Sequence, residues 1–474
     1  NRMIQDLTRG NPASLIVKFA LPLLIGNLFQ QLYQVSDIII VGRLISVDAL
    51  AALGASAPIF FVILLVTLGF TGGLTVITAQ RFGARDESGV RRSVTHSLRA
   101  CIILSFIFTL LLLVFLHPIL RWMNVPENIM DDAYKFMFVL GLALPVIVAY
   151  NLLSGFIRAL GDSKTPLYFL IATTVVNVLL NLFLISVCKL GVVGSALGTL
   201  ISITVSGICC AVYIGRRFPI LRLSREDWKY NRAFMKEHLN IAVPMAIQFS
   251  VLSVGLLIMQ KVCNSFGSDT IAAFTAALRI EQLATQPLVA LGIAMATFSA
   301  QNFGAGMIKR IRRGVLYSSL MSVSFSVFIA LLVRFVGENM ITVFSDDVTE
   351  QIVYTGRQYL NISTLFYIFL GQIFIFRNTL QGMGQSAIPL IAGFTELLMR
   401  SFAAIWLAGH IGYLGVCWAS PIAWFGAAMV VSVGYFVTIR KMNRRYLRNN
   451  LRMAAHKIGL LKPEKERPVL TPAE

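Results

Sequence analysis

Long apolar segments recur along almost the whole chain, and they limit its fold more than any other feature. Windows of about 20 residues, long enough to cross a bilayer, occur about twelve times. Their approximate cores are 15–41, 52–79, 96–117, 134–157, 166–188, 192–213, 239–263, 270–299, 316–336, 354–380, 386–409 and 412–438. Only 13% of the residues are charged, against about 25% in a typical soluble protein. The sequence therefore predicts an all-α integral membrane protein without a sizeable soluble domain.

The basic residues orient these spans. Arginine and lysine gather after spans 2, 6 and 8 and near the C-terminus, at 81–92, 216–236, 309–313 and 440–452. The loops after spans 3 and 9 carry acids instead. Because cytoplasmic loops are enriched in lysine and arginine, both termini and the linker 214–236 are predicted to be cytoplasmic. The net charge of +19 lies in these loops and not on a folded basic surface, so we expect a lipid bilayer and no nucleic acid as partner.

An internal repeat divides the chain into two halves. Pro22 matches Pro244, an offset of 244 − 22 = 222, and residues 79–84 match 300–305, an offset of 300 − 79 = 221. Gly161 matches Gly384, an offset of 384 − 161 = 223. Six spans in each half give a parallel repeat of the kind found in transporters, with substrate expected between the halves. We predict an N-lobe at 1–213, a cytoplasmic linker at 214–236, a C-lobe at 237–440 and a basic cytoplasmic tail at 441–474.

Asp37 lies inside the first predicted span. A carboxylate in hydrocarbon costs roughly 3 kcal/mol on permissive scales, so such an acid usually faces a partner or a polar cavity and marks an ion or proton site. Gln34 and Gln30 precede it on the same helix face. The alternative is a buried acid that only hydrogen-bonds neighbouring helices. Pro22, earlier in this span, removes a backbone hydrogen bond and is a candidate hinge or a static kink.

The duplicated motifs resemble those of the multidrug and toxic compound extrusion (MATE) transporters. They are Gln-x-Phe-Gly at the end of spans 2 and 8, Gly-x-Ser-x-x-Pro before spans 5 and 11, and Tyr-Gln-Val-Ser-Asp at 33–37. The resemblance runs from about residue 5 to about residue 440. It implies a twelve-helix antiporter of the bacterial inner membrane, acting as a monomer without an organic cofactor. Such a protein exports organic, often cationic and aromatic compounds while Na⁺ or H⁺ flows inward.

The resemblance is strongest to a DinF-like branch whose cation site lies in the N-lobe. Its acid of span 1, its asparagine and aspartate of span 5 and its threonine of span 6 fall here on Asp37, Asn177, Asn181 and Thr199. The departure is Asn181, where that branch has a carboxylate. One charge beside several neutral oxygens suits Na⁺ or K⁺ about as well as a proton. Asp37 is therefore the expected ligand of a monovalent cation.

Two further acids are secondary candidates for cation or substrate binding, together with Gln34. Another branch of the family uses carboxylates in spans 7 and 10, but this chain has no acid at 239–263 or 354–380. Glu281 in span 8 and Glu396 in span 11 remain. Because Glu396 and Arg400 are spaced i,i+4, a structural ion pair is the main alternative for Glu396.

Two rival functions are open to a chain of this kind. A flippase for lipid-linked oligosaccharides, from the same superfamily, tends to hold pyrophosphate with several basic residues, and spans 1, 2, 7 and 8 offer mainly Arg279. An enzyme is not expected, because no His-Glu-x-x-His or Gly-x-Ser-x-Gly motif occurs. The sequence does not separate a broad drug pump from a dedicated exporter of a secondary metabolite, nor Na⁺ from K⁺ or H⁺.

Overall fold

The computed structural model describes residues 5–343 and 349–457, and every regular element in this part of the chain is helical. Among the described residues, 11 helices are long and apolar enough to cross a membrane, and the count is up to 12 when one bent pair is taken as a span. The predicted all-α membrane fold of about twelve spans is confirmed. The basic tail predicted at 441–474 lies partly outside the described residues.

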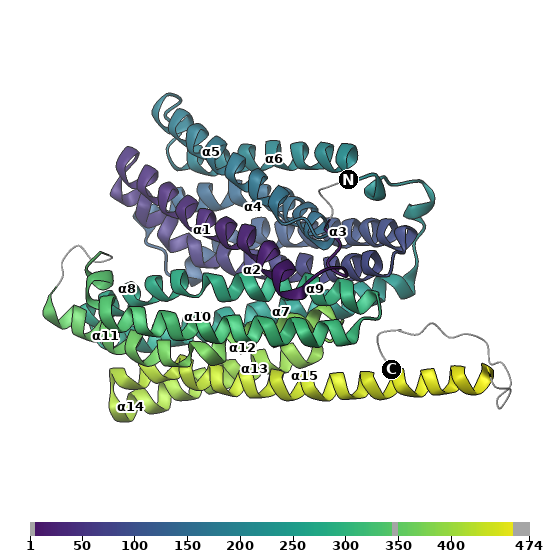
Figure 1. The fold of residues 1–474 in the computed structure, drawn as a ribbon. Coiled ribbons are helices and arrows are strands. Elements are labelled where there is room, and N and C mark those ends of the chain that lie inside the picture. Colours follow the sequence, from purple (N-terminus) through teal and green to yellow (C-terminus); the bar gives the residue numbers. More distant parts are fainter. Residues whose placement is uncertain (1–4, 344–348, 458–474) are drawn as a thin grey trace. The chain divides into compact units, whose positions relative to one another are not determined.

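The first half of the chain forms six long helices, one for each predicted span (Figure 1). They are α1 (Pro12–Leu44), α2 (Val47–Gly83), α3 (Glu87–Trp122), α4 (Glu127–Ala159), α5 (Lys164–Ser186) and α6 (Val192–Arg217). The linker that follows contains two short 3₁₀ turns, η1 (Pro219–Leu221) and η2 (Glu226–Trp228). Pro22 lies within α1, which continues through it without a break in its helical assignment.

The second half contains more helices because several of its spans are interrupted. They are α7 (Arg232–Asn264), α8 (Ser268–Ala284), α9 (Gln286–Gly304), α10 (Ile308–Val343), α11 (Glu350–Ser363), α12 (Tyr367–Gly382), α13 (Ala387–Phe402), α14 (Ala408–Ile411) and α15 (Tyr413–Lys457). The span expected at 270–299 is bent by 42° between α8 and α9. Pro287, in the first turn of α9, explains this break, since proline lacks an N–H group and clashes with the preceding turn.

Two other helix interruptions lie within segments that still count as single membrane spans. A 3₁₀ turn, η3 (Thr364–Phe366), separates α11 from α12, and a π-helical turn, η4 (Ala403–Leu407), separates α13 from α14. Such turns change which residues share a helix face, and they are often found at functional sites. Tyr359 and Tyr367 lie on opposite sides of the 3₁₀ turn, and both are almost fully buried.

The repeat seen in the sequence also appears in the backbone. Gly161 and Gly384 precede α5 and α13, and their φ angles are +88° and +80°. Gly191 and Gly412 precede α6 and α15, with φ angles of +59° and +64°. Only glycine adopts such angles without strain, so the duplicated glycines set the same turns in both halves. Next to the first of them, Asp162 Oδ1 accepts hydrogen bonds from the backbone N–H groups of residues 164 and 165 and caps α5.

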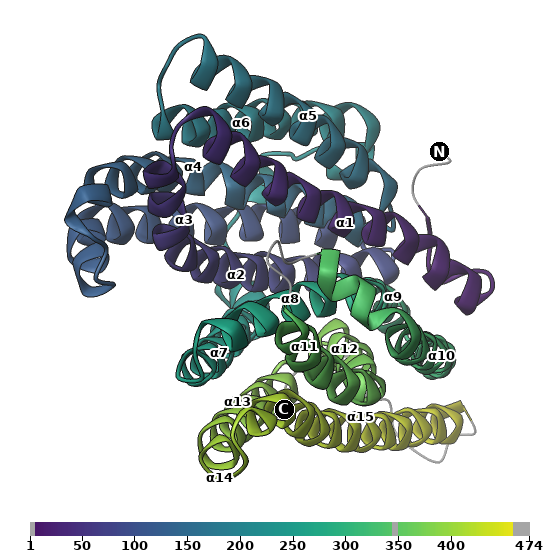
Figure 2. The ribbon, with the colours of Figure 1, turned by 90° about the vertical axis from the view of Figure 1, so that its left-hand side faces the viewer.

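The contacts of the chain define two compact units. The first unit contains Asn1–Asp6 and Val17–Ser253, and the second contains Leu7–Ile16 and Val254–Glu474. The division by contacts therefore falls inside α7, whereas the lobe boundaries taken from the repeat fall on either side of the linker and stay a prediction. Within the first unit α4 packs against α2, α3 and α6, and α5 packs against α6. Figure 2 shows α5 and α6 side by side, as does Figure 1.

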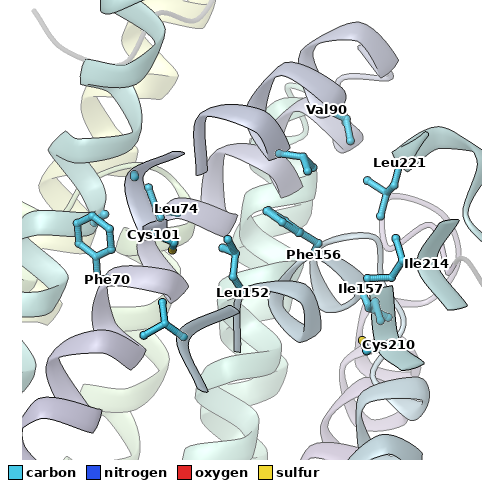
Figure 3. Packing of buried hydrophobic residues seen from close by; sticks show 14 of the residues in the cluster. Phe70, Leu74, Val90, Cys101, Leu152, Phe156, Ile157, Cys210, Ile214 and Leu221 are labelled. Carbon is cyan, nitrogen blue, oxygen red and sulfur yellow. The ribbon is translucent and has the colours of Figure 1, made fainter. Parts of the chain in front are cut away.

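Apolar side chains hold the helices of the first unit together. One buried cluster joins Phe70 and Leu74 of α2 to Leu152 and Phe156 of α4 and to Cys210 of α6 (Figure 3). A second cluster joins residues of α1, α2, α3, α4 and α6. Because lipid tails are as apolar as these side chains, the clusters stabilise helix packing through close van der Waals contact rather than through removal from water. These clusters fix α6, against which α5 then presents its polar residues.

The N-terminal segment Leu7–Ile16 is held by the second unit through the repeated Gln-x-Phe-Gly motif. The Leu7 N–H donates to Gln301 Oε1 at 3.0 Å, and the Leu7 carbonyl accepts from Asn302 Nδ2 and from Arg310 Nη2, both at 3.2 Å. Gln301 and Asn302 are fully buried. The motif in the second half therefore has a structural role, because it satisfies the backbone of a segment distant in sequence.

Candidate functional site

Asp37 lies in the second half of α1, where its carboxylate meets side chains of α5 and α6. Its Oδ1 accepts hydrogen bonds from Asn181 Nδ2 at 2.7 Å and from Ser195 Oγ at 3.2 Å. Both donors are fully buried. Among the described residues, none forms an ion pair with Asp37. The carboxylate thus has neutral partners and keeps its negative charge free for a cation.

The asparagines of α5 extend this contact into a chain of hydrogen bonds. Asn177 and Asn181 are one helical turn apart, and both face α6. Asn181 Nδ2 also donates to Asn177 Oδ1 at 3.1 Å. Asn177 Nδ2 in turn donates to Thr199 Oγ1 at 3.3 Å and to Ser202 Oγ at 3.4 Å. The four residues expected at the cation site therefore form one connected network.

Several members of this network were not anticipated from the sequence. Ser195 bonds Asp37, Ser202 bonds Asn177, and the Tyr33 hydroxyl lies 3.2 Å from Thr199 Oγ1. Ser195 could have been found by helical spacing, since it lies one turn before Thr199 on the same face of α6. Tyr33 likewise lies one turn before Asp37 on α1.

Gly198 makes room for the amide of Asn181. A Cβ atom at Gly198 would lie 1.9 Å from Asn181 Oδ1 and 3.1 Å from its Cγ, and real Cβ atoms do not approach other atoms so closely. The bare backbone of α6 at this position therefore allows the amide to fit between the helices. Small residues at helix contacts in membranes have this effect generally.

The donor set suits a monovalent cation. It consists of a carboxylate, amide oxygens and hydroxyls, which are the hard oxygen ligands preferred by alkali and alkaline-earth ions. Asn181 Oδ1 is buried and has no hydrogen-bond partner within the described part of the chain. Such orphaned buried oxygens call for an explanation, and an ion is one of the ordinary ones. The described residues include no cluster of three or more His, Cys, Asp or Glu side chains that could hold a metal ion.

The other candidates on α1 lie outside this network. Gln34 is exposed, and the described contacts do not bring it to the asparagines. Pro22 is buried in the first half of the helix. Of the candidates on α1, the network therefore contains Asp37 but neither Gln34 nor Pro22.

Glu281 occupies a separate polar site in the second unit. The Tyr359 hydroxyl of α11 donates to Glu281 Oε1 at 3.1 Å, and the Tyr367 hydroxyl of α12 donates to Oε2 at 3.4 Å. Both tyrosines are at most 1% exposed. The interruption between α11 and α12 lets two residues eight positions apart reach one carboxylate. As at Asp37, the hydrogen-bonding partners are neutral.

Glu396 has a different environment, because two arginines neutralise it. Arg377 Nη2 of α12 lies 3.1 Å from Glu396 Oε2, and Arg400 Nη2 lies 2.8 Å from Oε1. All three side chains are at most 7% exposed. The i,i+4 pair expected from the sequence is present, whereas the second arginine was missed. Both carboxylate oxygens are engaged, which leaves Glu396 poorly suited to bind a further cation.

Comparison with known families gives a match to the MatE family over residues 22–183 and 244–406. The two matches begin 244 − 22 = 222 residues apart, the offset of the internal repeat. The probable multidrug resistance protein YoeA of Bacillus subtilis is 27% identical over 433 residues, which cover 89% of this chain and 93% of YoeA. The multidrug export protein MepA of Staphylococcus haemolyticus is 25% identical over 413 residues, with 86% and 90% covered.

Solved structures share the fold of this chain. A crystal structure of a MATE protein in complex with MaL6 superposes with a TM-score of 0.87 at 24% identity and covers 94% of this chain and 100% of that one. A transporter of the MOP superfamily from Pyrococcus furiosus superposes with a TM-score of 0.86 at 24% identity, with 93% and 98% covered. At this identity the likeness establishes the fold alone, and it confirms the predicted architecture.

Proposed function

Since the chain belongs to the MatE family, the multidrug and toxic compound extrusion transporters, we propose that it is an antiporter that exports organic compounds against inward flow of Na⁺, K⁺ or H⁺. The protein is a multi-pass membrane transporter and, as predicted, not an enzyme. Cation coupling is a property of the family. The choice of ion, the substrates and the residues that couple them are our proposal.

One observation carries the proposal, namely the continuous network from Asp37 through Asn181 and Asn177 to Thr199. It joins α1, α5 and α6 around a single negative charge. A bound cation neutralises this charge, and its departure restores it. A ligand shifts a conformational equilibrium only as far as it binds one state better than the other. A cation that binds better to one packing of α1 against α5 and α6 therefore drives the change between the two conformations of the transporter.

In this scheme α1 is the moving element. The cation binds to Asp37 with Asn177, Asn181 and Thr199 as partners, and α1 bends or rotates about Pro22, which has no N–H group to hold the preceding turn. The movement releases substrate on the outer side. Gln34, exposed on α1 close to Asp37, is then a candidate contact for substrate.

The second unit contributes one further acid. We assign Glu281 as a secondary cation or substrate site, because Tyr359 and Tyr367 orient its carboxylate without neutralising it. We assign Glu396 a structural role, because Arg377 and Arg400 engage both of its oxygens. Breaking a buried ion pair is strongly destabilising, so such a group is poorly placed to release and rebind ions.

The substrates we propose are aromatic or cationic drugs, since YoeA and MepA are described as multidrug proteins. A dedicated exporter of a secondary metabolite, such as the precolibactin exporter, is the narrower alternative. We place the protein as a monomer in a bacterial inner membrane with both termini in the cytoplasm, following the distribution of basic residues. The flippase alternative rests mainly on Arg279, which is exposed on α8, because the buried Arg377 and Arg400 are already engaged by Glu396.

The proposed function is tested by efflux from proteoliposomes that contain the purified protein. A fluorescent aromatic cation is loaded inside, and gradients of Na⁺, K⁺ and H⁺ are imposed one at a time. We expect at least one gradient to accelerate efflux over protein-free vesicles. If no gradient does so while polyprenyl phosphates bind the protein, the flippase assignment replaces this one.

A further inference from the structure

The amide nitrogen of Asn181 lies where two oxygen acceptors converge. Asp37 Oδ1 is 2.7 Å away and Asn177 Oδ1 is 3.1 Å away. An amide nitrogen carries two N–H groups and accepts nothing, so both of its hydrogens are used here. An ionised carboxylate only accepts hydrogen bonds, so the end of the amide that faces Asp37 is its nitrogen. The –NH₂ group thus occupies the position in which a small cation would contact both oxygens.

The opposite end of the same amide is unsatisfied. Asn181 Oδ1 is fully buried and makes no hydrogen bond to any residue that the structure describes. It lies against the bare α-carbon of Gly198, where a Cβ would be only 1.9 Å away. Burying a strong acceptor without a partner is unfavourable. Only the nitrogen end of the amide is therefore hydrogen-bonded. Its oxygen end is available to coordinate an ion.

We propose that the Asn181 amide stands in for the coupling cation and that an alkali cation binds by rotating this amide. Rotation about the last side-chain bond moves Nδ2 out of the position between the two oxygens, which the ion then takes, and turns Oδ1 toward the ion. The ion is then held by Asp37 Oδ1, Asn177 Oδ1 and Asn181 Oδ1, with the Ser195 hydroxyl beside the first. This inference rests on the proposed cation site and adds how that site is kept closed when the ion has left.

An amide at position 181 makes release of the ion easier than a carboxylate would. A carboxylate at this position would place two anions about 2.7 Å apart, by the present distance, and like charges so close destabilise one another unless a cation joins them. Such a site would bind its ion tightly and release it reluctantly. The amide stabilises the ion-free state with its own N–H groups, so the ion competes with an internal donor and leaves more readily.

Rotation of the Asn181 amide also requires glycine at position 198, because the amide must turn through the space beside α6. A methyl group there would occupy the volume now taken by Oδ1 and would hinder both orientations. Gly54 offers a matched control, since a Cβ at that position meets no atom within 4 Å. Gly54 and Gly198 are both helical, so alanine has the same small helix-favouring effect at each.

The test is direct binding of Na⁺ and K⁺ to the purified full-length protein, measured by calorimetry in a choline buffer without substrate. We expect Asn181→Asp to bind its preferred ion at least tenfold more tightly than the unmodified protein. We expect Gly198→Ala to bind at least tenfold more weakly and Gly54→Ala to be unchanged. Thermal unfolding and gel filtration establish that each variant is folded. If Gly198→Ala does not fold, Asn181→Asp alone decides.

The outcomes separate this inference from the proposed function. Asp37→Asn should abolish ion binding, and if binding survives in that variant, the proposed cation site itself is wrong. If Asp37→Asn abolishes binding but Asn181→Asp binds no more tightly, the cation site stands and the displacement of the amide is overturned. Equal ion affinity in folded Gly198→Ala and Gly54→Ala would overturn the rotation as well.

Discussion

Arg377 of α12 and Glu396 of α13 form a buried ion pair with a distance of 3.1 Å between Nη2 and Oε2. Arg400 completes the group from one turn further along α13. The three side chains carry a net single positive charge, and Arg400 also lies close enough to Glu281 to interact with its carboxyl group electrostatically. The group links α12 to α13 through buried charges, whereas Asp37 in the first unit has neutral hydrogen-bonding partners.

Replacing Glu396 by glutamine should destabilise the protein by about 3–5 kcal/mol, since it leaves two buried guanidinium groups without their counter-charge. Glu338→Gln is the control, because its pair with Arg357 is exposed and such pairs contribute about 0–1 kcal/mol. Unfolding in detergent, followed by intrinsic fluorescence, measures both. A Glu396→Gln protein of normal stability that has lost transport would instead make Glu396 a functional acid.

Glu281→Gln should leave cation binding at Asp37 intact and weaken binding of a cationic dye by about tenfold, or 1.4 kcal/mol. The reason is that the hydrogen-bonding partners of this carboxyl group, Tyr359 and Tyr367, are neutral, so a cationic dye supplies its counter-charge. Tyr359→Phe removes one donor to that carboxylate and should give a smaller effect in the same direction. Fluorescence polarisation of the dye reports its affinity, and calorimetry reports the ion. Loss of ion binding in Glu281→Gln would move part of the coupling site to the second unit.

Asn302→Ala should free the N-terminal segment from the second unit. The substitution removes the amide that donates to the Leu7 carbonyl, and a hydrogen bond of this kind contributes about 0.5–1.5 kcal/mol. We expect faster proteolysis between residues 7 and 16 at unchanged overall secondary structure. Asn264→Ala, at an exposed position, is the control, and equal cleavage in both variants would exclude a role of the motif in holding the segment.

Asp227, in the linker between the two halves of the chain, should make docking of that linker sensitive to acid. Burial acts to raise the pKa of Asp227, but hydrogen bonds from Ser224 and the nearby Arg91 outweigh it and lower the pKa below its ordinary value. A lowered folded-state pKa contributes stability above the unfolded value of about 3.9, and this contribution is lost as pH falls from there through the folded value.

Hydrogen exchange of residues 222–231 measures this docking. The segment should stay protected at neutral pH and lose protection below about pH 4. Asp227→Asn should be less protected at neutral pH and show a weaker response to acid. An identical acid response in the variant would assign the effect to other groups.

The fold and the residues that lie together around Asp37 followed from the sequence to a large extent. Span length in a bilayer is set by hydrophobic thickness, so apolar windows located the helices. The spacing of Asn177 and Asn181 placed both on one face of α5, and the family resemblance added Asp37 and Thr199. The break before Pro287 could have been predicted from that proline, which ends the preceding helix for steric reasons.

The remaining contacts depend on how each helix is rotated about its axis. In a soluble protein an apolar stripe reveals this rotation, but a membrane helix is apolar on most faces. Serines also bond their own backbone by default, so helical spacing could place Ser195 on the Thr199 face of α6 but could not pair it with Asp37. For the same reason Arg377 could not be assigned to Glu396, nor Tyr359 and Tyr367 to Glu281.

The central claim is that Asp37 is the charged ligand through which a cation drives export. Its most direct test compares Asp37→Asn with Asp131→Asn, an exposed acid, in proteoliposomes under the ion gradient that drives the unmodified protein. We predict that Asp37→Asn loses at least 90% of gradient-driven efflux, a loss of about 1.4 kcal/mol or more in transition-state terms, while Asp131→Asn retains it. Gradient-driven efflux at the normal rate from a folded Asp37→Asn protein would contradict the account.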